Sequence, residues 1–335
     1  AAEATGAAAV RLAASGLTPD KIVTQKSVEN AIRVLMAIGG STNAVIHLAA
    51  IAGRAGLDVS LKRLNELSDT TPVLVNLKPV GNGYMEDFHS AGGMGALMRE
   101  IKDLLHLDAM TVTGETLGER LAGEGAAWVD RNYVLARGTP LEPVGGLVAL
   151  YGNLAPGGAI LKRSAADQRL FEHEGRAIVF TSLEDLSKRV DDPDLDITAD
   201  DIMVLQNAGP NAPECMPEAG FLPIPKKLAK AGVKDMIRIS DARMSGTAYG
   251  TVVLHITPDS ASGGPLAFVR NGDRIKLSIK NRTIDLLVDE ATLEKRRSEP
   301  RQTFEKPTRG YAKLFADEIT GADLGCDFRF LRKAP

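Results

Sequence analysis

The apolar positions of this chain repeat at helical spacing in its first part and gather into short runs in the rest. Residues 28–36 and 94–105 place apolar side chains three and four positions apart, which predicts two helices. From about residue 147, apolar and β-branched runs are bounded by Gly, Asn and Pro, a pattern typical of strands. Residues 275–280 alternate apolar and polar side chains most clearly. The sequence therefore predicts a helical part followed by a β-rich part.

Pro and Gly cluster at residues 137–143, where the helical periodicity ends, and we place a domain boundary there. Many short strands joined by tight turns indicate a closed or nearly closed β-barrel. The fold class is therefore α/β, with a partial α/β amino-terminal domain followed by a β-barrel domain with flanking helices. We expect the α/β domain at residues 1–138, the β-barrel domain at 139–300, and a carboxy-terminal tail and helix at 301–335.

Shorter segments are assigned by the same rules. Residues 61–67 and 183–190 are predicted helices, and 311–319 is a predicted terminal amphipathic helix. The charged run 294–300 is interpreted as a solvated linker. The expected strands are 72–77, 147–151, 156–162, 177–180, 202–206, 237–239, 251–256, 275–280 and 283–288.

The composition narrows the class of protein. The 335 residues carry a net charge of -3 and only 4% aromatic residues, so nothing indicates a nucleic-acid partner. No window approaches ~18 uninterrupted apolar residues, so no membrane span is expected. The two cysteines, Cys215 and Cys326, are far apart, which argues against a disulfide framework and for a reducing, cytoplasmic compartment. They are also too few for a four-thiolate cluster or zinc site.

One polar stretch lies between two apolar runs, 237–239 and 251–256. The small and hydroxylated residues between the runs predict a strand, a tight turn and a second strand. Gly246 allows the backbone to approach a ligand closely, and Ser245 and Thr247 place hydroxyls on either side of it. By residue type alone, a turn whose polar side chains bond their own backbone is the commoner outcome.

A second polar stretch precedes an apolar helix. Ser41, Thr42 and Asn43 follow Gly39 and Gly40 and are strong N-cap candidates. A glycine-rich loop that opens a helix presents N–H groups at the positive end of the helix dipole, which favours an anion or carboxylate. The alternative is a capped, buried helix packed through small residues, and the frequency of purely structural caps favours that alternative.

Taken together, these segments resemble the dehydratase family that includes dihydroxy-acid dehydratase, phosphogluconate dehydratase and the pentonate and hexonate sugar-acid dehydratases. The resemblance covers nearly all of the chain, and it implies that the barrel is of the swivelling type. Six motifs carry it, in the family's order. They are Gly39-Gly40-Ser41-Thr42-Asn43-Ala44, Tyr151-Gly152-Asn153-Leu154-Ala155-Pro156, Met216-Pro217-Glu218, Asp241-Ala242-Arg243-Met244-Ser245-Gly246-Thr247, Gly263-Gly264-Pro265 and Gly325-Cys326-Asp327-Phe328.

The resemblance also implies roles for individual residues. Ser245 matches the family's proposed base, which acts as an alkoxide, Thr247 matches a second active-site hydroxyl, and Glu218 matches a carboxylate that ligates Mg²⁺. A metal that grips the substrate carboxylate stabilises the enediolate formed when the C2 proton leaves, and nearby positive charge lowers the pKa of a serine. In the family a 2Fe-2S cluster acts as Lewis acid for the departing C3 hydroxyl. The expected substrate contacts are Thr247, Ser41, Thr42 and Asn43.

The family's amino-terminal part carries the cluster cysteines, two acidic Mg²⁺ ligands and a modified lysine ligand, and it has no counterpart here. We therefore expect no cluster cysteine in this chain, and neither the cluster nor a complete magnesium site. Under this interpretation the chain is the carboxy-terminal portion of a longer enzyme.

Met244-Ser245-Gly246-Thr247 stands where dihydroxy-acid dehydratases usually carry Phe-Ser-Gly-Gly, which favours a sugar-acid substrate. Our hypothesis is a hydro-lyase of the pentonate type that converts a sugar acid to a 2-keto-3-deoxy acid. Two alternatives share this chemistry, namely dihydroxy-acid and phosphogluconate dehydration. An alternative of another class is an inactive fragment that binds a sugar acid or a partner. The resemblance further implies a homo-oligomer, either a dimer or a tetramer.

Overall fold

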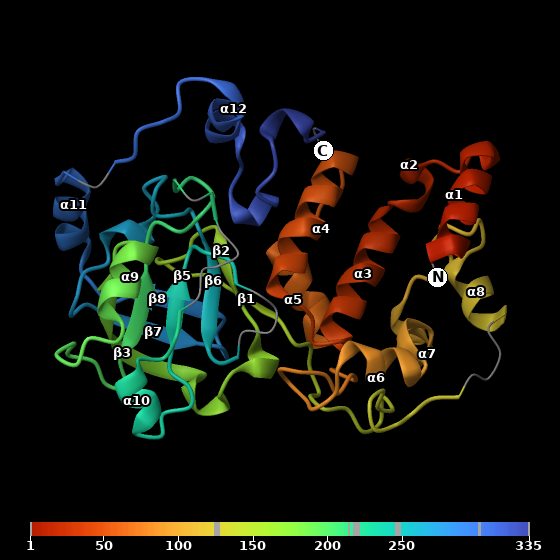
Figure 1. Cartoon of the computed structure of the whole chain (residues 1–335), viewed down its shortest axis with the longest axis horizontal. Coiled ribbons are helices and arrows are strands. Elements are labelled where there is room, and N and C mark those ends of the chain that lie inside the picture. The colour runs from red at the N-terminus through yellow and green to blue at the C-terminus, as the bar shows by residue number, and fades with distance from the viewer. Residues whose placement is uncertain are drawn as a thin grey trace.

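The chain forms a helical part and a part built around one sheet, as Figure 1 shows for the whole molecule. This computed structural model describes residues 2–123, 128–213, 215–216, 222–244, 249–300 and 303–333. Helices α1 to α8 lie together on one side, and the strands lie on the other side with α9 to α12 around them. Within the described residues, no helix combines the length and the apolar character that crossing a membrane requires.

The helices of the first part account for most of its described residues. They are α1 (Ala2–Ser15), α2 (Pro19–Ile22), α3 (Gln25–Ala37), α4 (Thr42–Ala55), α5 (Leu61–Asp69), α6 (Met85–Ser90), α7 (Gly93–Glu100) and α8 (Leu117–Gly123). Helix α3 begins with a capping box, in which the backbone N–H of Ser27 donates to the Thr24 hydroxyl and the N–H of Thr24 donates to the Ser27 hydroxyl. Its apolar face is buried, as the helical spacing predicts.

The second part contains eight strands and the remaining helices. The strands are β1 (Val148–Leu150), β2 (Gly158–Leu161), β3 (Glu172–Phe180), β4 (Ile202–Leu205), β5 (Arg238–Ser240), β6 (Val252–Thr257), β7 (Arg274–Ser278) and β8 (Thr283–Leu286). The helices are α9 (Leu183–Arg189), α10 (Lys226–Lys230), α11 (Glu290–Ser298) and α12 (Gly310–Glu318). Short 3₁₀ helices are η1 (Lys102–Leu104), η2 (Arg163–Ala165), η3 (Gln168–Leu170), η4 (Pro265–Phe268), η5 (Ala322–Leu324) and η6 (Arg329–Leu331).

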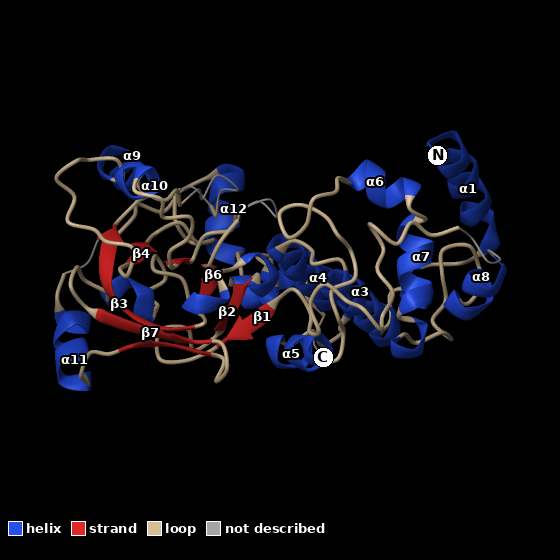
Figure 2. Cartoon of the chain, turned by 90° about the horizontal axis from the view of Figure 1, so that it is seen from below, coloured by secondary structure: helices blue, strands red, loops and turns tan. Residues whose placement is uncertain are grey.

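The strands form one mixed sheet in the order β1-β2-β6-β5-β4-β3-β7-β8. The four central strands, β6, β5, β4 and β3, are parallel to one another, whereas β1 with β2, β2 with β6, β3 with β7 and β7 with β8 pair antiparallel. Parallel strands bury both faces, and β4, β5 and β6 are buried along their whole length. Figure 2 shows the sheet from below, with helices outside it.

The two ends of the sheet meet at Tyr151, which nearly closes the barrel. The N–H of Tyr151 donates to the carbonyl of Arg282 at 2.9 Å, and the N–H of Ile284 donates to the carbonyl of Tyr151 at 2.7 Å. Asn153 extends this junction, because its side-chain amide donates to the carbonyl of Leu286 and accepts the N–H of the same residue. The motif that begins at Tyr151 therefore has a structural role in barrel closure. The expectation of a nearly closed barrel is confirmed.

Apolar side chains fill the barrel and the space between the sheet and α9. One cluster contains Val204, Ile239 and Val253 from the central strands, together with Leu154. A second cluster lies on the other face, where Phe180 and Met203 pack against residues of α9 and α10. These two clusters support the central strands from both sides, so the loops at the strand ends are carried by a rigid frame.

Two local predictions differ from the structure. Residues 72–77 are extended and mostly buried, but they form only isolated bridges, such as Val73 with Glu142, because the facing segment is irregular and continues no ladder. The charged run 294–300 belongs for most of its length to α11, so its interpretation as a solvated linker is wrong. Leu293 packs into the barrel core, and the Arg296 guanidinium forms a two-pronged ion pair with Asp273, which hold this charged helix in place.

Asn65 joins the helical part to the edge of the sheet. Its side chain is buried on α5, accepts the N–H of Ala149 at 2.8 Å and donates to the carbonyl of Ala149 at 3.0 Å. The Ser68 hydroxyl, one turn further on, donates to the carbonyl of Leu147 at 2.6 Å. These bonds cover the backbone of β1 on its outer edge, which would otherwise present unpaired groups.

We expect Asn65→Ala to lower the free energy of unfolding by about 2–6 kcal/mol, because two buried backbone groups of Ala149 lose their partner at about 1–3 kcal/mol each. Urea denaturation measures this difference. The matched control is Lys62→Ala, an exposed position on the same helix, which should change stability by less than about 0.5 kcal/mol. Equal stability of the two variants would contradict the account of this junction.

Candidate functional site

The loops that follow β4, β5 and β6 converge on the carboxylate of Asp241. Because these strands are parallel, their carboxyl ends lie at the same edge of the sheet. Asp241 directly follows β5 and is 0% exposed. Its Oδ1 accepts the N–H of Ala208 at 3.0 Å, and its Oδ2 accepts the N–H of Ser260 at 2.7 Å. One buried side chain therefore fixes the positions of three loops.

Burial raises the pKa of Asp241 to about 6, although the N–H groups of Ser260 and Ala208 act in the opposite direction. The nearby carboxylate of Asp259 also raises this pKa. Asp259 organises the neighbouring loop, because its carboxylate accepts the side-chain amide of Asn211 at 2.6 Å and the N–H of Ser262 at 2.8 Å. Two buried carboxylates thus lie at the carboxyl edge of the sheet, each held by hydrogen bonds.

A hydrogen bond joins the flanks of the two motifs that carry the expected catalytic residues. The Nε of Arg243 donates to the carbonyl of Met216 at 3.0 Å. Glu218 follows Met216 by two positions, and Ser245 follows Arg243 by two positions. Glu218, Ser245 and Thr247 themselves lie outside the described residues. The bond shows that the described flanks of both motifs are in contact.

Helix α4 and the carboxy-terminal tail meet at the same place. Ile46 of α4, Met216 and Ala322 of η5 form a small buried cluster with Cys326 against it. The Cys326 Sγ lies 3.4 Å from the Met216 Sδ. Three segments that are far apart in sequence, namely α4, the segment of Met216 and the tail, therefore meet beside Arg243, which lies on a fourth segment.

An ion pair fixes the tail to α4. The Nε and Nη2 of Arg54 donate to the two carboxylate oxygens of Asp327 at 2.7 and 2.6 Å. The Arg54 guanidinium lowers the pKa of Asp327, so this carboxylate is charged at neutral pH. Thr320 closes the tail on itself through its N–H, which donates to the carbonyl of Asp327 at 2.9 Å. Asp327 of the last motif therefore has a structural role, because its contacts hold the neighbouring Cys326 in position.

The three polar residues at the start of α4 begin that helix as the sequence indicates. Ser41 is its N-cap, and the Ser41 hydroxyl accepts the N–H of Asn43 at 3.2 Å. Thr42 is buried and Asn43 is half-buried, and Ile46 lies one turn further along the helix beside Met216. The capped helix that the sequence predicts as the purely structural alternative is therefore present. A contact of these residues with substrate remains a prediction.

His255 is a buried residue close to Arg243 that the sequence did not single out as functional. It has a positive φ of 59°, it is 4% exposed, and its Nε2 has no hydrogen-bond partner within the described part of the chain. Burial and the charge of Arg243 lower the pKa of His255 to about 3, so the ring is neutral at physiological pH. The charge at this point of the site is therefore that of Arg243 and not of the imidazole.

The described residues do not fit an iron–sulfur cluster or a complete magnesium site. The chain has two cysteines, Cys215 and Cys326, whereas a 2Fe-2S cluster takes four thiolate ligands. Among residues 2–123, 128–213, 215–216, 222–244, 249–300 and 303–333, no group of three or more His, Cys, Asp or Glu side chains could hold a metal ion.

Sequence patterns alone do not reveal the roles of Asp241, Arg243 and the Met216 carbonyl. Asp241 and Arg243 stand inside a motif, but only the parallel strand order brings the first to Ala208 and Ser260. Arg243 binds a backbone carbonyl, which almost any residue at position 216 would supply. The residue type there therefore gives no sign of the contact. A signal was present only for Asp241, as a charged residue directly after an apolar run.

Two family models match the chain. The amino-terminal model of dihydroxy-acid/6-phosphogluconate dehydratases matches residues 1–120, and the carboxy-terminal model of the same family matches residues 133–326. The six motifs of the sequence lie within these two matches, apart from the last residues of the tail motif.

Curated relatives match over nearly the whole chain. An L-arabinonate dehydratase of Rhizobium leguminosarum bv. trifolii is 46% identical over 99% of this chain and 57% of its own length. A 6-deoxy-6-sulfo-D-gluconate dehydratase of Pseudomonas putida is 46% identical over 98% of this chain and 57% of its own length. A dihydroxy-acid dehydratase of Ignicoccus hospitalis is 38% identical over 97% of this chain and 58% of its own length. The chain thus spans somewhat more than half the length of these relatives.

Replacing Asp241 by Asn should change how stability depends on pH. The folded-state pKa of about 6 lies above the ordinary value of 3.8, so the folded state binds the proton more tightly than the unfolded chain. The resulting stabilisation is present below pH 4 and is lost as the pH rises through about 6. The unfolding free energy of the parent minus that of Asp241→Asn should therefore fall between pH 4 and pH 7, by up to about 3 kcal/mol.

Urea denaturation of both proteins at a series of pH values measures this difference, and the other titrating groups cancel from it. A difference that stays constant, or that grows as the pH rises, would show that the Asp241 carboxyl is not held in the buried environment described.

Proposed function

Because the chain belongs to the dihydroxy-acid/6-phosphogluconate dehydratase family, we propose that it forms the part of a sugar-acid dehydratase that supplies the base. The observation that carries the proposal is the 3.0 Å bond from Arg243 to the Met216 carbonyl. It joins the flank of the motif containing Ser245 to the flank of the motif containing Glu218, as a shared active site requires. The hydro-lyase class follows from the family, and the residue roles below are our proposal.

In the proposed reaction, Ser245 removes the C2 proton of a sugar acid. The electron pair of the C–H bond moves toward the carboxylate, the C3 hydroxyl leaves as hydroxide, and the proton held by the serine oxygen is returned to the leaving group to give water. The enol that remains tautomerises to a 2-keto-3-deoxy acid. Thr247 provides a second hydroxyl beside the substrate, and Ser41, Thr42 and Asn43 are proposed to contact its carboxylate end.

A serine hydroxyl is a weak base unless positive charge stabilises its alkoxide. Arg243 brings such a charge into this region, since its guanidinium contributes to the lowered pKa of the buried His255. It stands two positions before Ser245 in the sequence. We propose that Arg243 contributes to the field that favours the alkoxide, while the neutral His255 ring adds no competing charge.

Mg²⁺ and a 2Fe-2S cluster are proposed cofactors of the longer protein only. Glu218 is the one residue of this chain that we propose as a magnesium ligand. The chain spans 57% of the length of its L-arabinonate dehydratase relative, and we propose that the remaining ligands belong to the part of the longer protein outside this span.

Two observations support a sugar acid as substrate. The relatives at 46% identity are named for arabinonate and for a sulfogluconate, whereas the dihydroxy-acid dehydratases match at 38%. This chain also carries Met244-Ser245-Gly246-Thr247, in which Thr247 adds a hydroxyl where a glycine would add none. A hydroxyl at this point suits a polyhydroxylated substrate, because it can pair with a substrate hydroxyl that a branched aliphatic acid lacks.

In the full-length protein, Ser245→Ala should reduce the rate of 2-keto-3-deoxy acid formation by roughly 10²–10⁴-fold or more, the contribution typical of general base catalysis. The melting temperature should not change. Ser187→Ala, on the exposed side of α9, is the control and should keep the parental rate. Retained turnover in Ser245→Ala would sink the assignment of the base, and an inactive parent protein would favour the binding-module alternative.

Assays with a panel of substrates distinguish pentonate dehydration from phosphogluconate and dihydroxy-acid dehydration. We expect the highest kcat/KM for a pentonate, at least about tenfold above that for 6-phosphogluconate or a branched-chain dihydroxy acid, since one lost polar contact is worth about 1.4 kcal/mol or more. Formation of 2-keto acid is the readout for each compound. A higher kcat/KM for the branched-chain dihydroxy acid would contradict the sugar-acid proposal and would favour dihydroxy-acid dehydration.

A further inference from the structure

A β-bulge interrupts β6 close to the proposed active site. The register of β6 against β2 shifts between Leu254 and Thr257, so that two residues of β6, His255 and Ile256, lie opposite one residue of β2. His255 has a φ of 59°, in the left-handed region that residues with a side chain rarely adopt. Bulges bend a strand and change the direction of a side chain, and they are common beside active sites.

The bulge joins β6 to the segment that leads to the proposed base. The last parallel pair of β5 and β6 joins Ile239 to Val253. Two positions after Val253, the N–H of His255 donates to the carbonyl of Ala242 at 3.1 Å. Ala242 directly precedes Arg243 in the sequence. The bulged residue therefore holds the backbone immediately before the guanidinium that reaches Met216.

Further hydrogen bonds hold both partners of this contact. The N–H of Ala242 donates to the Ser240 hydroxyl at 3.0 Å, and the Thr257 hydroxyl donates to the carbonyl of His255 at 2.9 Å. Ala242 is 0% exposed. The backbone that leads to Arg243 is therefore fixed through the bulge and not only through β5.

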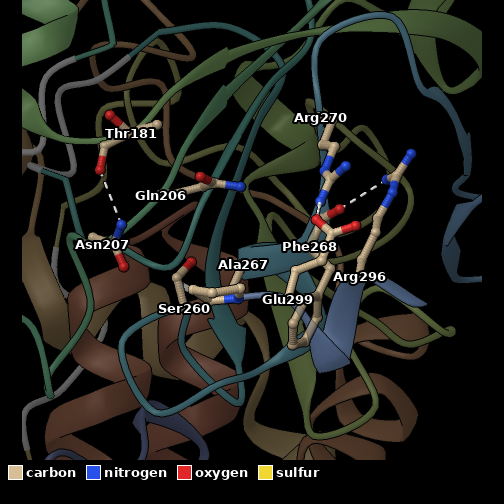
Figure 3. A pocket seen from close by; sticks show the side chains of 10 residues that line it. Thr181, Gln206, Asn207, Ser260, Ala267, Phe268, Arg270, Arg296 and Glu299 are labelled. Atoms are coloured by element: carbon tan, nitrogen blue, oxygen red, sulfur yellow. Dashed lines mark hydrogen bonds and ion pairs between the residues drawn. The ribbon is translucent and has the colours of Figure 1, made fainter. Parts of the chain in front are cut away.

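The neighbouring loops are fixed independently of the bulge. Asn207, in the loop after β4, and Ser260, in the loop after β6, line one cavity of about 180 Å³, as Figure 3 shows. Asp241 accepts the N–H of Ser260 and the N–H of the residue after Asn207. Asp241 thus positions these loops, whereas His255 holds the next residue of the segment. The direction of Arg243 depends on both.

The His255 side chain lies near the Arg243 guanidinium. It is 4% exposed, and the charge of Arg243 contributes to its lowered pKa, which shows that the two groups are close. Its Nε2 makes no hydrogen bond within the described part of the chain. The ring therefore contributes volume next to the guanidinium and no opposite charge that would draw the guanidinium away from the Met216 carbonyl.

Few residue types meet both requirements at position 255. A left-handed φ favours glycine, asparagine, aspartate and histidine. Glycine would leave the space beside Arg243 unfilled, and aspartate would bring a carboxylate that competes for the guanidinium. A neutral histidine allows the bulge, fills the space and leaves the guanidinium to the Met216 carbonyl.

We propose that His255 is a positioning residue of the active site, which directs Arg243 toward the Met216 carbonyl through its bulged backbone and its uncharged ring. The inference rests on the proposed function, because it links the direction of Arg243 to the step in which Ser245 removes a proton. His255 acts through Arg243 and takes no proton itself.

The variants His255→Asn and His255→Asp of the full-length protein form a matched pair. Both side chains tolerate a left-handed backbone and have nearly the same shape, but they differ in charge. We expect kcat for pentonate dehydration to be at least about tenfold lower in His255→Asp than in His255→Asn, because the carboxylate draws the guanidinium away. The two KM values should agree within about twofold, since substrate contacts are unchanged. Equal kcat values would overturn the proposal.

Asn65→Ala is the control for a loss of stability, because it weakens the outer edge of the sheet at β1 and not the site. It should keep the parental kcat at a temperature at which it is folded. A kcat of Asn65→Ala as low as that of His255→Asp would show that turnover follows stability alone, and would contradict a positioning role for His255.

A double-mutant cycle tests the contact between positions 255 and 243 without turnover. Urea denaturation gives the unfolding equilibrium constants of His255→Asn and His255→Asp, each with and without Arg243→Gln. We expect Arg243→Gln to raise this constant at least about tenfold more in the His255→Asp background, where a buried carboxylate loses its partner. Absence of this coupling would overturn the proposal. Failure of the proposed function would differ, since the parent would be inactive while the coupling persisted.

Discussion

The two hydrogen bonds to the buried carboxylate of Asp241 are the constraint on which the site depends. They join the loop after β4, through Ala208, to the loop after β6, through Ser260, and they fix the start of the segment that leads to Arg243. A carboxylate in such a place is costly to bury, which the raised pKa of about 6 reflects. The arrangement is sustained because the central parallel strands are packed on both faces and hold the donors at fixed positions.

This constraint extends outward to segments that are distant in sequence. Arg243 reaches the Met216 carbonyl, Met216 packs on Ile46 of α4, and Cys326 of the tail contacts Met216. Arg54 and Asp327 fix that tail from the other side. The helical part, the barrel and the tail therefore share one meeting point, and the proposed catalytic residues belong to the two motifs whose flanks lie there.

Much of the fold was predictable because its signals are local. The strand at 202–206, the alternating pair at 275–280 and 283–288, and the cap at Ser41 all follow from residue type and spacing. The mixed strand order was not predictable, since parallel pairing of β3 to β6 depends on contacts far apart in sequence. The prediction of a solvated linker at 294–300 was wrong because charged side chains of this run form ion pairs within the protein. For the site, the motifs indicated which segments matter, but not that Asp241 and Arg243 connect them.

The central claim is that the motifs containing Glu218 and Ser245 serve one sugar-acid site beside the contact of Arg243 with Met216. The most direct test is an experimental structure of the full-length Ser245→Ala protein with a bound pentonate and Mg²⁺. The account predicts that C2 of the pentonate lies next to residue 245 and that the Glu218 carboxylate ligates the metal that holds the substrate. A pentonate bound away from both residues, with the Arg243–Met216 contact intact, would contradict it.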